Sequence, residues 1–235
     1  MKQSRHVFLA GASRGVGREI ALLLRAKQVA VTALLRSDAT QGELERMGVT
    51  VMLGDALDHD ATARAMASVD PIDAVISTVG GVSDDGVRSD FIGNRNLIDA
   101  YRALRTTESE PGVRTRARFI LVSSIGAGDS AVAIPSQVRE RLAGALDEKT
   151  AAEAHLIQSG LTYTVIRPGG LKSEPATGRG VLTQDSRISG TIHRPDVARL
   201  VSDCLMSDRA DNVVLAAVDR DLVRDGSTFE VFALN

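Results

Sequence analysis

Three glycines near the amino terminus have the spacing of a phosphate-binding loop. Residues 11–17 read GASRGVG, directly after a short apolar run and at the start of a pattern with helical period. Gly11 permits a tight turn, Gly15 lets the backbone approach a pyrophosphate, and Gly17 lets a helix pack against the preceding strand. The unpaired N–H groups of that helix bind anions. The residues predicted to contact a dinucleotide here are Gly11, Ser13, Arg14, Gly15, Val16 and Gly17.

The end of the next predicted strand selects between the two nicotinamide dinucleotides. An acidic residue there accepts hydrogen bonds from the adenosine 2′-hydroxyl, whereas an arginine pairs with a 2′-phosphate. Leu35 is followed by Arg36, Ser37 and Asp38. Arg36 and Ser37, with Arg14 approaching from the glycine loop, favour NADP(H) over NAD(H). Asp38 keeps NAD(H) as the alternative, because a small shift of register places it at the ribose.

The elements that must position these residues alternate between strands and helices. Continuous apolar runs separated by helical patterns are typical of parallel strands covered on both faces. The sequence therefore predicts one α/β domain over residues 1–235, a three-layer Rossmann-type fold with a mainly parallel twisted sheet and helices on both faces. The predicted strands are His6–Ala10, Val29–Leu35, Val49–Leu53, Ala74–Thr78, Phe119–Ser123, Thr162–Ile166 and Val213–Ala217, with Thr228–Ala233 as a candidate final edge strand.

Three stretches that follow strands lie at the carboxyl edge of the predicted sheet, where open α/β folds bind ligands. They cover residues 80–90, 125–137 and 171–189, and we expect them to form the pocket for a small-molecule substrate. Residues 171–189 are long for a connection, which is typical of a functional lid or a disordered segment. By contrast, Arg105–Arg118 follows a helix, so its charges are interpreted as a solvated loop and not as a nucleic-acid site.

The motifs at these strand ends resemble, in order, those of the atypical short-chain dehydrogenase/reductases. Within them the chain looks closest to the NmrA-like and flavin/biliverdin-reductase-like NAD(P)H-binding proteins. The glycine pattern G-x-x-x-G-x-G departs from the G-x-x-G-x-x-G frequent in that group and matches the main branch of the superfamily. The matching segments are GDAL at 54–57, STVGG at 77–81, DFIGNRNLIDA at 90–100, SSIGAG at 123–128, Lys149 with Glu153, IRPGGL at 166–171 and HRPDVA at 193–198.

The resemblance implies where further residues contact the dinucleotide. Asp55, next to Ala56, would hold the adenine. Thr78, Val79 and Gly80 would run under the adenine ribose and the nicotinamide. The residues implied at the nicotinamide end are Ser123, Lys149, Pro168, Gly169, Gly170 and Leu171.

A catalytic tyrosine is missing from its expected position. Most of the superfamily reduces carbonyls with a Tyr-x-x-x-Lys pair, in which the tyrosine donates a proton as hydride arrives. Here Ala145 stands four residues before Lys149. Tyr101 lies on the apolar face of a predicted helix and Tyr163 inside a predicted strand, so both are interpreted as core residues. The predicted catalytic residues are therefore Lys149, which would bind the ribose, and Ser124, which would orient the acceptor or relay a proton.

The missing tyrosine limits the chemistry, because an unassisted serine hydroxyl is a weak acid near neutral pH. The sequence predicts an NADPH-dependent oxidoreductase that transfers hydride to a small conjugated acceptor of the flavin, quinone or tetrapyrrole type, which spreads the charge and takes its proton from solvent. A non-catalytic NADP(H) sensor or scaffold is the alternative that the NmrA resemblance allows. A sugar-nucleotide epimerase or carbonyl reductase needs the absent tyrosine or a substitute for it.

Composition argues against several other classes of protein. The 235 residues carry 28 Lys+Arg against 30 Asp+Glu, a net charge of −2, so no nucleic-acid partner is predicted. One cysteine excludes an internal disulfide, and four histidines without metal-pair spacing predict no metal. No signal peptide or membrane span is recognised, so we expect a cytoplasmic monomer or homodimer without a membrane partner.

Four further residues receive structural interpretations. Cys204 lies on an apolar helical stripe and is interpreted as a buried, inert thiol. Glu153 follows Lys149 by one turn and is expected to pair with it. Asp58 is interpreted as a helix start. His193 is interpreted as a partly exposed residue at a helix start, with contact to the substrate as the alternative.

Overall fold

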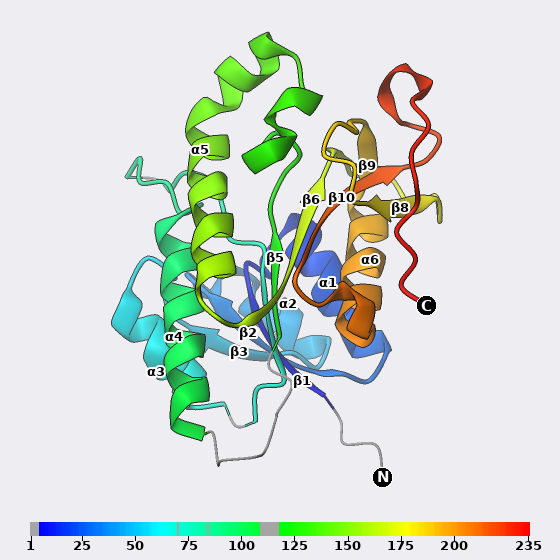
Figure 1. Cartoon of the computed structure of the whole chain (residues 1–235). Helices are drawn as coiled ribbons and strands as arrows, with labels where there is room; N and C mark the ends of the chain where they lie inside the picture. The colour runs from blue at the N-terminus through cyan, green and yellow to red at the C-terminus, as the bar shows by residue number, and fades with distance from the viewer. Residues whose placement is uncertain (1–4, 70, 84, 109–117) are drawn as a thin grey trace.

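The computed structural model describes residues 5–69, 71–83, 85–108 and 118–235. Within these ranges eight strands form one sheet in the order β3-β2-β1-β4-β5-β6-β10-β8, and each neighbouring pair except β10–β8 is parallel. The predicted α/β fold with a mainly parallel sheet is confirmed (Figure 1). The strands of this sheet are β1 (His6–Ala10), β2 (Ala30–Leu35), β3 (Thr50–Leu53), β4 (Ala74–Ser77), β5 (Arg118–Val122), β6 (Thr162–Pro168), β8 (Gly180–Thr183) and β10 (Val213–Asp219).

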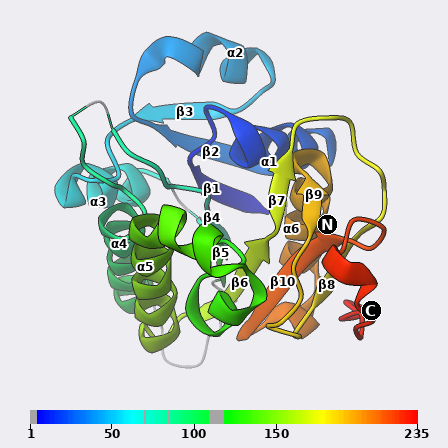
Figure 2. The ribbon, with the colours of Figure 1, turned by 90° about the horizontal axis from the view of Figure 1, so that it is seen from above.

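Helices cover both faces of the sheet (Figure 2). One group, α1 and α6, lies side by side on one face, and the other group, α3, α4 and α5, covers the opposite face. Within the described part of the chain, none of the helices is long and apolar enough to cross a membrane. The helices are α1 (Gly15–Ala26), α2 (Gln41–Arg46), α3 (His59–Ala67), α4 (Ile92–Glu108), α5 (Ser136–Gln158) and α6 (Arg194–Met206), with short 3₁₀ turns η1 (Asp38–Thr40), η2 (Gly128–Ala133), η3 (Asp208–Ala210) and η4 (Arg224–Gly226).

The apolar strands divide their side chains between two cores. In β1, Val7 and Leu9 pack with α1 and α6, whereas Phe8 packs with α3, α4 and α5. This division follows from the alternation of side chains along a strand, which sends neighbours to opposite faces. Tyr101 of α4 and Phe119 of β5 are both fully buried in the second core. The three-layer arrangement therefore follows from strands that are apolar on both faces.

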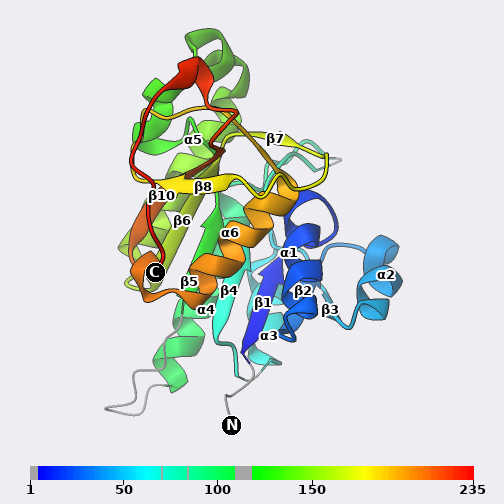
Figure 3. The ribbon, with the colours of Figure 1, turned by 90° about the vertical axis from the view of Figure 1, so that its right-hand side faces the viewer.

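The sequence locates the seven parallel strands well and the edge of the sheet poorly. All seven predicted runs are strands whose ends differ from the prediction by at most two residues. Thr228–Ala233 is not a strand, and that prediction is wrong. The edge place beside β10 is taken by β8, which is buried along its whole length. The C-terminal segment runs outside β8, where the Phe232 N–H donates to the Leu182 carbonyl at 2.7 Å (Figure 3).

Two of the predicted loops contain regular structure. The stretch 171–189 includes β8 and most of β7 (Gly170–Lys172), so it is not one long lid. β7 pairs in parallel with β9 (Thr191–His193), outside the main sheet. The stretch 125–137 contains η2 and the first residues of α5.

The charged segment Arg105–Arg118 is not simply a solvated loop. Arg105 belongs to α4, residues 109–117 lie outside the described residues, and Arg118 opens β5 with a side chain that is only 3% exposed. The guanidinium of Arg118 donates to the carbonyls of Cys204 and, at 2.9 Å, Ser207, and it pairs with Asp211. A cation at the end of a helix satisfies carbonyls that have no partner within the helix, so Arg118 anchors the carboxyl end of α6 to the sheet.

Candidate functional site

A cavity of about 950 Å³ opens at the carboxyl edge of the sheet, between the glycine loop and α5. Parallel strands bring their carboxyl ends to the same edge, so segments that are far apart in the sequence meet here. Ala10 pairs in register with both Leu34 and Ser77, which places the glycine loop between the end of β2 and the end of β4. The predicted residues that line the cavity are Gly11, Ser13, Arg14, Gly15, Val16, Gly17, Arg36, Ser37, Asp55, Ala56, Thr78, Val79, Gly80, Ser123, Ser124, Lys149 and Leu171.

Three predicted contact residues are not among those that line the cavity. Pro168 ends β6, and the N–H of Gly169 donates to the Ala217 carbonyl at 2.9 Å. A Cβ at Gly169 would lie 2.4 Å from the carbonyl oxygen of Gly190, so this glycine is needed for a close approach between two backbone segments. Gly170 continues that contact through its N–H to the same carbonyl. These residues shape the chain beside the site without lining it.

The glycine loop is closely packed on the end of β4. Gly11 has a φ of 90°, which favours glycine, and its carbonyl accepts a hydrogen bond from the Thr78 hydroxyl at 3.0 Å. A Cβ on Gly17 would lie 2.1 Å from that carbonyl oxygen and 2.5 Å from the Thr78 Oγ1. The first turn of α1 therefore packs against the glycine loop more closely than any side chain at Gly17 would allow, as in the glycine-rich turns that bind a pyrophosphate.

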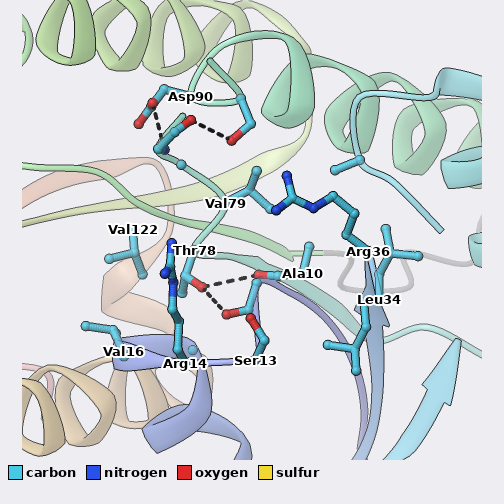
Figure 4. Close-up of a pocket in the computed structure, with 18 of the residues that line it drawn as sticks. Ala10, Ser13, Arg14, Val16, Leu34, Arg36, Thr78, Val79, Asp90 and Val122 are labelled. Carbon is cyan, nitrogen blue, oxygen red and sulfur yellow. Dashed lines mark hydrogen bonds between the residues drawn. The ribbon is translucent and has the colours of Figure 1, made fainter. Parts of the chain in front are cut away.

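Three arginines line this end of the cavity. Arg14 and Arg36 extend from the glycine loop and from the end of β2 into the cavity (Figure 4), and Arg194 enters from the start of α6. Within the described residues, none of the three has a carboxylate at salt-bridge distance. Arg36 lines the cavity, whereas Asp38 belongs to η1 and does not. This end of the site fits a polyanionic ligand.

The segment predicted to hold the adenine is fixed by hydrogen bonds within it and from α4. Asp55 accepts the Leu57 N–H at 2.9 Å with Oδ1. The amide of Asn96, which is buried, donates to the carbonyls of Ala56 and Leu57 at 2.9 and 3.1 Å. Asn96 has a structural role that the sequence analysis missed, because an asparagine inside a helical pattern gives no sign of its distant partner.

At the other end of the cavity, Lys149 forms an ion pair with Asp90. The Nζ of Lys149 lies 2.9 Å from Oδ1 of Asp90, whose side chain is only 2% exposed. The other oxygen accepts the Gly81 N–H at 2.9 Å, and Arg88 Nη1 lies 3.3 Å from it. A Cβ on Gly80 would lie 2.6 Å from Asp90 Oδ1, so only glycine leaves room for the pair beside the cavity. The lysine is therefore held by a buried carboxylate that the sequence analysis did not single out.

The predicted Lys149–Glu153 pair is wrong, because Glu153 is turned to a different cation. Arg167 of β6 donates to both carboxylate oxygens of Glu153, at 3.1 and 2.6 Å, and also pairs with Asp129 of η2. Burial opposes the charge of Arg167, but its hydrogen bonds to Glu153 and Asp129 raise its pKa. The bond from Arg167 lowers the pKa of Asp129. This network ties η2, which follows Ser123 and Ser124 in the chain, to α5 and the sheet.

The two serines at the end of β5 differ in their hydrogen bonding. The Ser124 hydroxyl donates to the Ile125 carbonyl at 3.0 Å. The Ser123 Oγ is buried and has no hydrogen-bond partner among the described residues. A buried hydroxyl without a partner costs free energy, so Ser123 is the serine whose environment is incomplete.

Neither of the two tyrosines lines the cavity. Tyr101 is fully buried in α4, and its hydroxyl donates to the Ile72 carbonyl at 3.4 Å. Tyr163 lies near the start of β6, at the opposite edge of the sheet, and is half-buried. The interpretation as a core residue holds fully for Tyr101 and in part for Tyr163.

Cys204, Asp58 and His193 are the other residues for which the sequence predicts a structural role. Cys204 is buried as predicted, and burial raises its pKa to about 12. Asp58 caps α3 by accepting the Ala61 N–H at 2.9 Å. His193 does stand at the start of α6, but it is buried, with 9% of its surface exposed, and its Nδ1 bonds the Pro175 carbonyl at 2.7 Å. His193 does not line the cavity.

Comparisons with known proteins agree with this geometry. A model of the NAD(P)H-binding family matches residues 11–208. ChuY of Escherichia coli O157:H7, described as an anaerobillin reductase, has a solved structure that is 33% identical, with a TM-score of 0.79 over 92% of this chain and 98% of that one.

Two curated relatives cover similar shares. The uncharacterized sugar epimerase YhfK of Bacillus subtilis is 30% identical over 88% of this chain and 90% of its own length. The sanguinarine reductase of Eschscholzia californica is 26% identical over 88% and 86%. With a glycine loop opening on a cavity at the carboxyl edge of a parallel sheet, the chain belongs to the NAD(P)H-binding family.

Proposed function

We propose that the protein is an NADPH-dependent oxidoreductase that transfers hydride to a small conjugated acceptor. The observation that carries this proposal is the internal pairing at the end of the cavity that holds Lys149, Ser123 and Ser124, here called the reaction end. Asp90 neutralises Lys149, the Ser124 hydroxyl is bonded to a carbonyl, and no tyrosine lines the cavity. Such a site lacks a strong proton donor, so it suits an acceptor whose negative charge is spread over a conjugated system and is protonated by solvent.

Different residues around the cavity would bind different parts of the dinucleotide. The glycine loop and the N-terminus of α1 would bind the pyrophosphate, and Lys149 would bind the nicotinamide ribose. Ser123 has a buried hydroxyl that lacks a partner, and we propose that it bonds the nicotinamide half. When bound, the dinucleotide supplies the hydride, and the protein holds the acceptor against it at short range.

Arg36 and Arg14 support NADPH as the preferred form. Arg36 lines the cavity from the end of β2, where folds of this type read the adenosine ribose, and Asp38 does not line it. A guanidinium binds a phosphate through parallel hydrogen bonds and gains little from a neutral hydroxyl. The 2′-phosphate of NADPH is the group that would pair with it.

The relatives are compatible with reduction, and it is the missing tyrosine that argues against epimerisation. ChuY and sanguinarine reductase are both described as reductases, whereas YhfK is described as a sugar epimerase. An epimerase or carbonyl reductase of the tyrosine type would need an acid and base where this chain has Ala145. The predicted cytoplasmic location and the monomer or homodimer state stay predictions.

The proposal is tested by mixing the purified protein with NADPH or NADH and a panel of flavins, quinones, tetrapyrroles and carbonyl compounds, while the nicotinamide absorbance is followed. We expect oxidation of NADPH with at least one conjugated acceptor and slower oxidation of NADH. Binding of NADPH without oxidation by any acceptor would favour the sensor or scaffold. Turnover with carbonyl compounds alone would contradict the acceptor class, and equal use of NADH would contradict the role of Arg36.

A further inference from the structure

Arg194 lines the cavity but belongs neither to the glycine loop nor to the end of β2. It is the first residue of α6, and α6 packs beside α1 (Figure 3). Its Nε lies 3.6 Å from the point where a Cβ on Gly15 would stand, so the guanidinium lies over the first residue of α1. Two helix starts and one guanidinium therefore meet at the same part of the cavity.

The charge of Arg194 has no counter-ion in the described part of the chain. Its Nη1 donates to the hydroxyl of Ser173 at 2.7 Å, and no carboxylate of the described residues lies at salt-bridge distance from it. By contrast, Arg167 pairs with Glu153 at 2.6 Å and Arg199 with Asp203 at 3.0 Å. A guanidinium carries five N–H donors, so the bond to Ser173 fixes one side of the group and leaves other donors for a ligand.

We propose that Arg194 binds the pyrophosphate of the dinucleotide and that Ser173 orients it for this contact. The inference rests on the proposed function, because it needs a dinucleotide in the cavity. Gly15 stands where the backbone must approach the pyrophosphate, and Arg194 is placed over that residue. Arg36 lies instead at the end of β2, where the adenosine ribose is read.

This placement assigns the two arginines different phosphates. NADPH and NADH share the pyrophosphate, and only NADPH carries the 2′-phosphate. Removal of Arg194 therefore weakens the binding of both dinucleotides by the same factor, whereas removal of Arg36 weakens NADPH alone. The ratio of the two affinities separates the two roles.

The experiment compares Arg194→Gln, Arg194→Lys and Arg36→Gln by titrating NADPH and NADH and following the nicotinamide fluorescence. We expect Arg194→Gln to raise both dissociation constants by about tenfold or more, as the loss of one charge-assisted hydrogen bond predicts, with their ratio unchanged. Arg194→Lys keeps the charge and should lose less. The dissociation constant of 2′-AMP, which lacks a pyrophosphate, is obtained by competition with NADPH. It should be unchanged in Arg194→Gln and raised in Arg36→Gln.

Ser173→Ala tests the orienting role of the serine. We expect a smaller loss of affinity than in Arg194→Gln, and no additional loss when Ser173→Ala is combined with Arg194→Gln, because the bond is already gone. Full additivity of the two losses would overturn the role of Ser173.

Two results would overturn the assignment of Arg194 itself. One is an Arg194→Gln protein that binds both dinucleotides as the parent does, and the other is a loss confined to NADPH. A parent protein that is folded by circular dichroism and binds neither dinucleotide would overturn the proposed function, and this inference with it. The two failures are therefore distinguishable.

Discussion

The two ends of the cavity differ in whether their cationic side chains have a carboxylate partner. At the phosphate end, Arg14, Arg36 and Arg194 point into the cavity without a carboxylate at salt-bridge distance in the described structure. At the reaction end, Lys149 is paired with buried Asp90. The first arrangement is incomplete until an anion arrives, and the second is nearly complete without a ligand.

This difference indicates where binding free energy comes from. An unpaired guanidinium gains charge-assisted hydrogen bonds when a phosphate enters, and each of these is worth about 1.5–3 kcal/mol. A lysine that already has a buried partner gains less from a neutral ribose. We infer that the dinucleotide is held mainly by its phosphates, whereas the reaction end mainly fixes geometry.

Gly17→Ala should have the largest effect, because it removes the phosphate end as a whole. The new Cβ would lie 2.1 Å from the Gly11 carbonyl oxygen, so the glycine loop must shift away from its position on Thr78. The loss of two or more contacts to phosphate predicts a rise in the NADPH dissociation constant of about 100-fold or more. Fluorescence titration measures it.

The matched control for this substitution is Gly42→Ala. Gly42 lies in α2 and has open space around its Cβ position. Alanine there should leave binding unchanged and stabilise the helix by up to about 1 kcal/mol. Normal NADPH affinity in Gly17→Ala would show that the loop does not need its close packing.

Lys149→Met should affect stability and turnover together. Asp90 is then left with Gly81 and Arg88 but without its lysine, and a buried carboxylate that loses a partner costs about 1–3 kcal/mol of unfolding free energy. Turnover should fall by about tenfold as the contact to the ribose is lost. Urea denaturation and steady-state kinetics measure the two effects.

Asp90→Asn separates the two roles of this pair. Combined with Lys149→Met, it should recover most of the lost stability, because a neutral amide needs no cation, and it should not recover turnover. A double variant that is no more stable than Lys149→Met would show that the 2.9 Å contact contributes little. The reaction end would then be no better paired than the phosphate end.

Ser124→Ala and Ser123→Ala should have smaller and contrasting effects. Ser124 donates to the Ile125 carbonyl, so its loss should slow turnover by a few-fold and leave NADPH affinity unchanged. Ser123 has a buried hydroxyl without a partner, so alanine should leave the free protein equally or more stable and weaken NADPH binding by a few-fold. Loss of all turnover in Ser124→Ala would show that this serine does more than orient the acceptor.

The smallest effect concerns the pH dependence of stability. Arg167 keeps the pKa of Asp129 below its usual value, so the folded protein retains this charge where the unfolded chain is already protonated. The stabilisation is therefore complete above the unfolded pKa of about 4 and is lost as the pH falls further. Asp129→Asn should remove this part of the acid dependence in urea denaturation below that pH. An unchanged profile would mean that Asp129 adds nothing.

Local patterns placed residues of both ends at the cavity, but they missed the partner of Lys149. The glycine loop and Arg36 follow strands directly, so their positions depend only on where those strands end. The partner of Lys149 is Asp90, which lies far before it in the sequence and follows an irregular loop. No periodicity links two such residues. The expected i,i+4 partner, Glu153, instead forms an ion pair with Arg167 of β6.

The edge of the sheet failed for a related reason. Thr228–Ala233 has the composition of a strand, but β8 already occupies the place beside β10. Competition between two segments for one edge is decided by packing, which composition does not report. Arg194 was missed in the same way, because a basic residue at the start of a helix gains meaning only from its distance to the glycine loop.

A guanidinium lies at each end of α6, one from Arg118 of β5 and one from Arg194 of the helix itself, and only the first suits the helix dipole. Arg118 meets the carbonyls at the carboxyl end, where a cation is favourable. Arg194 adds positive charge at the amino end, where the helix dipole opposes it by about 0.3–1 kcal/mol. The hydrogen bond to Ser173 offsets part of this unfavourable dipole interaction, and a bound anion would remove the rest, so Arg194 suits the loaded protein better than the free one. Substitutions that neutralise Arg194 should accordingly appear in selections for thermostability and disappear in selections for function.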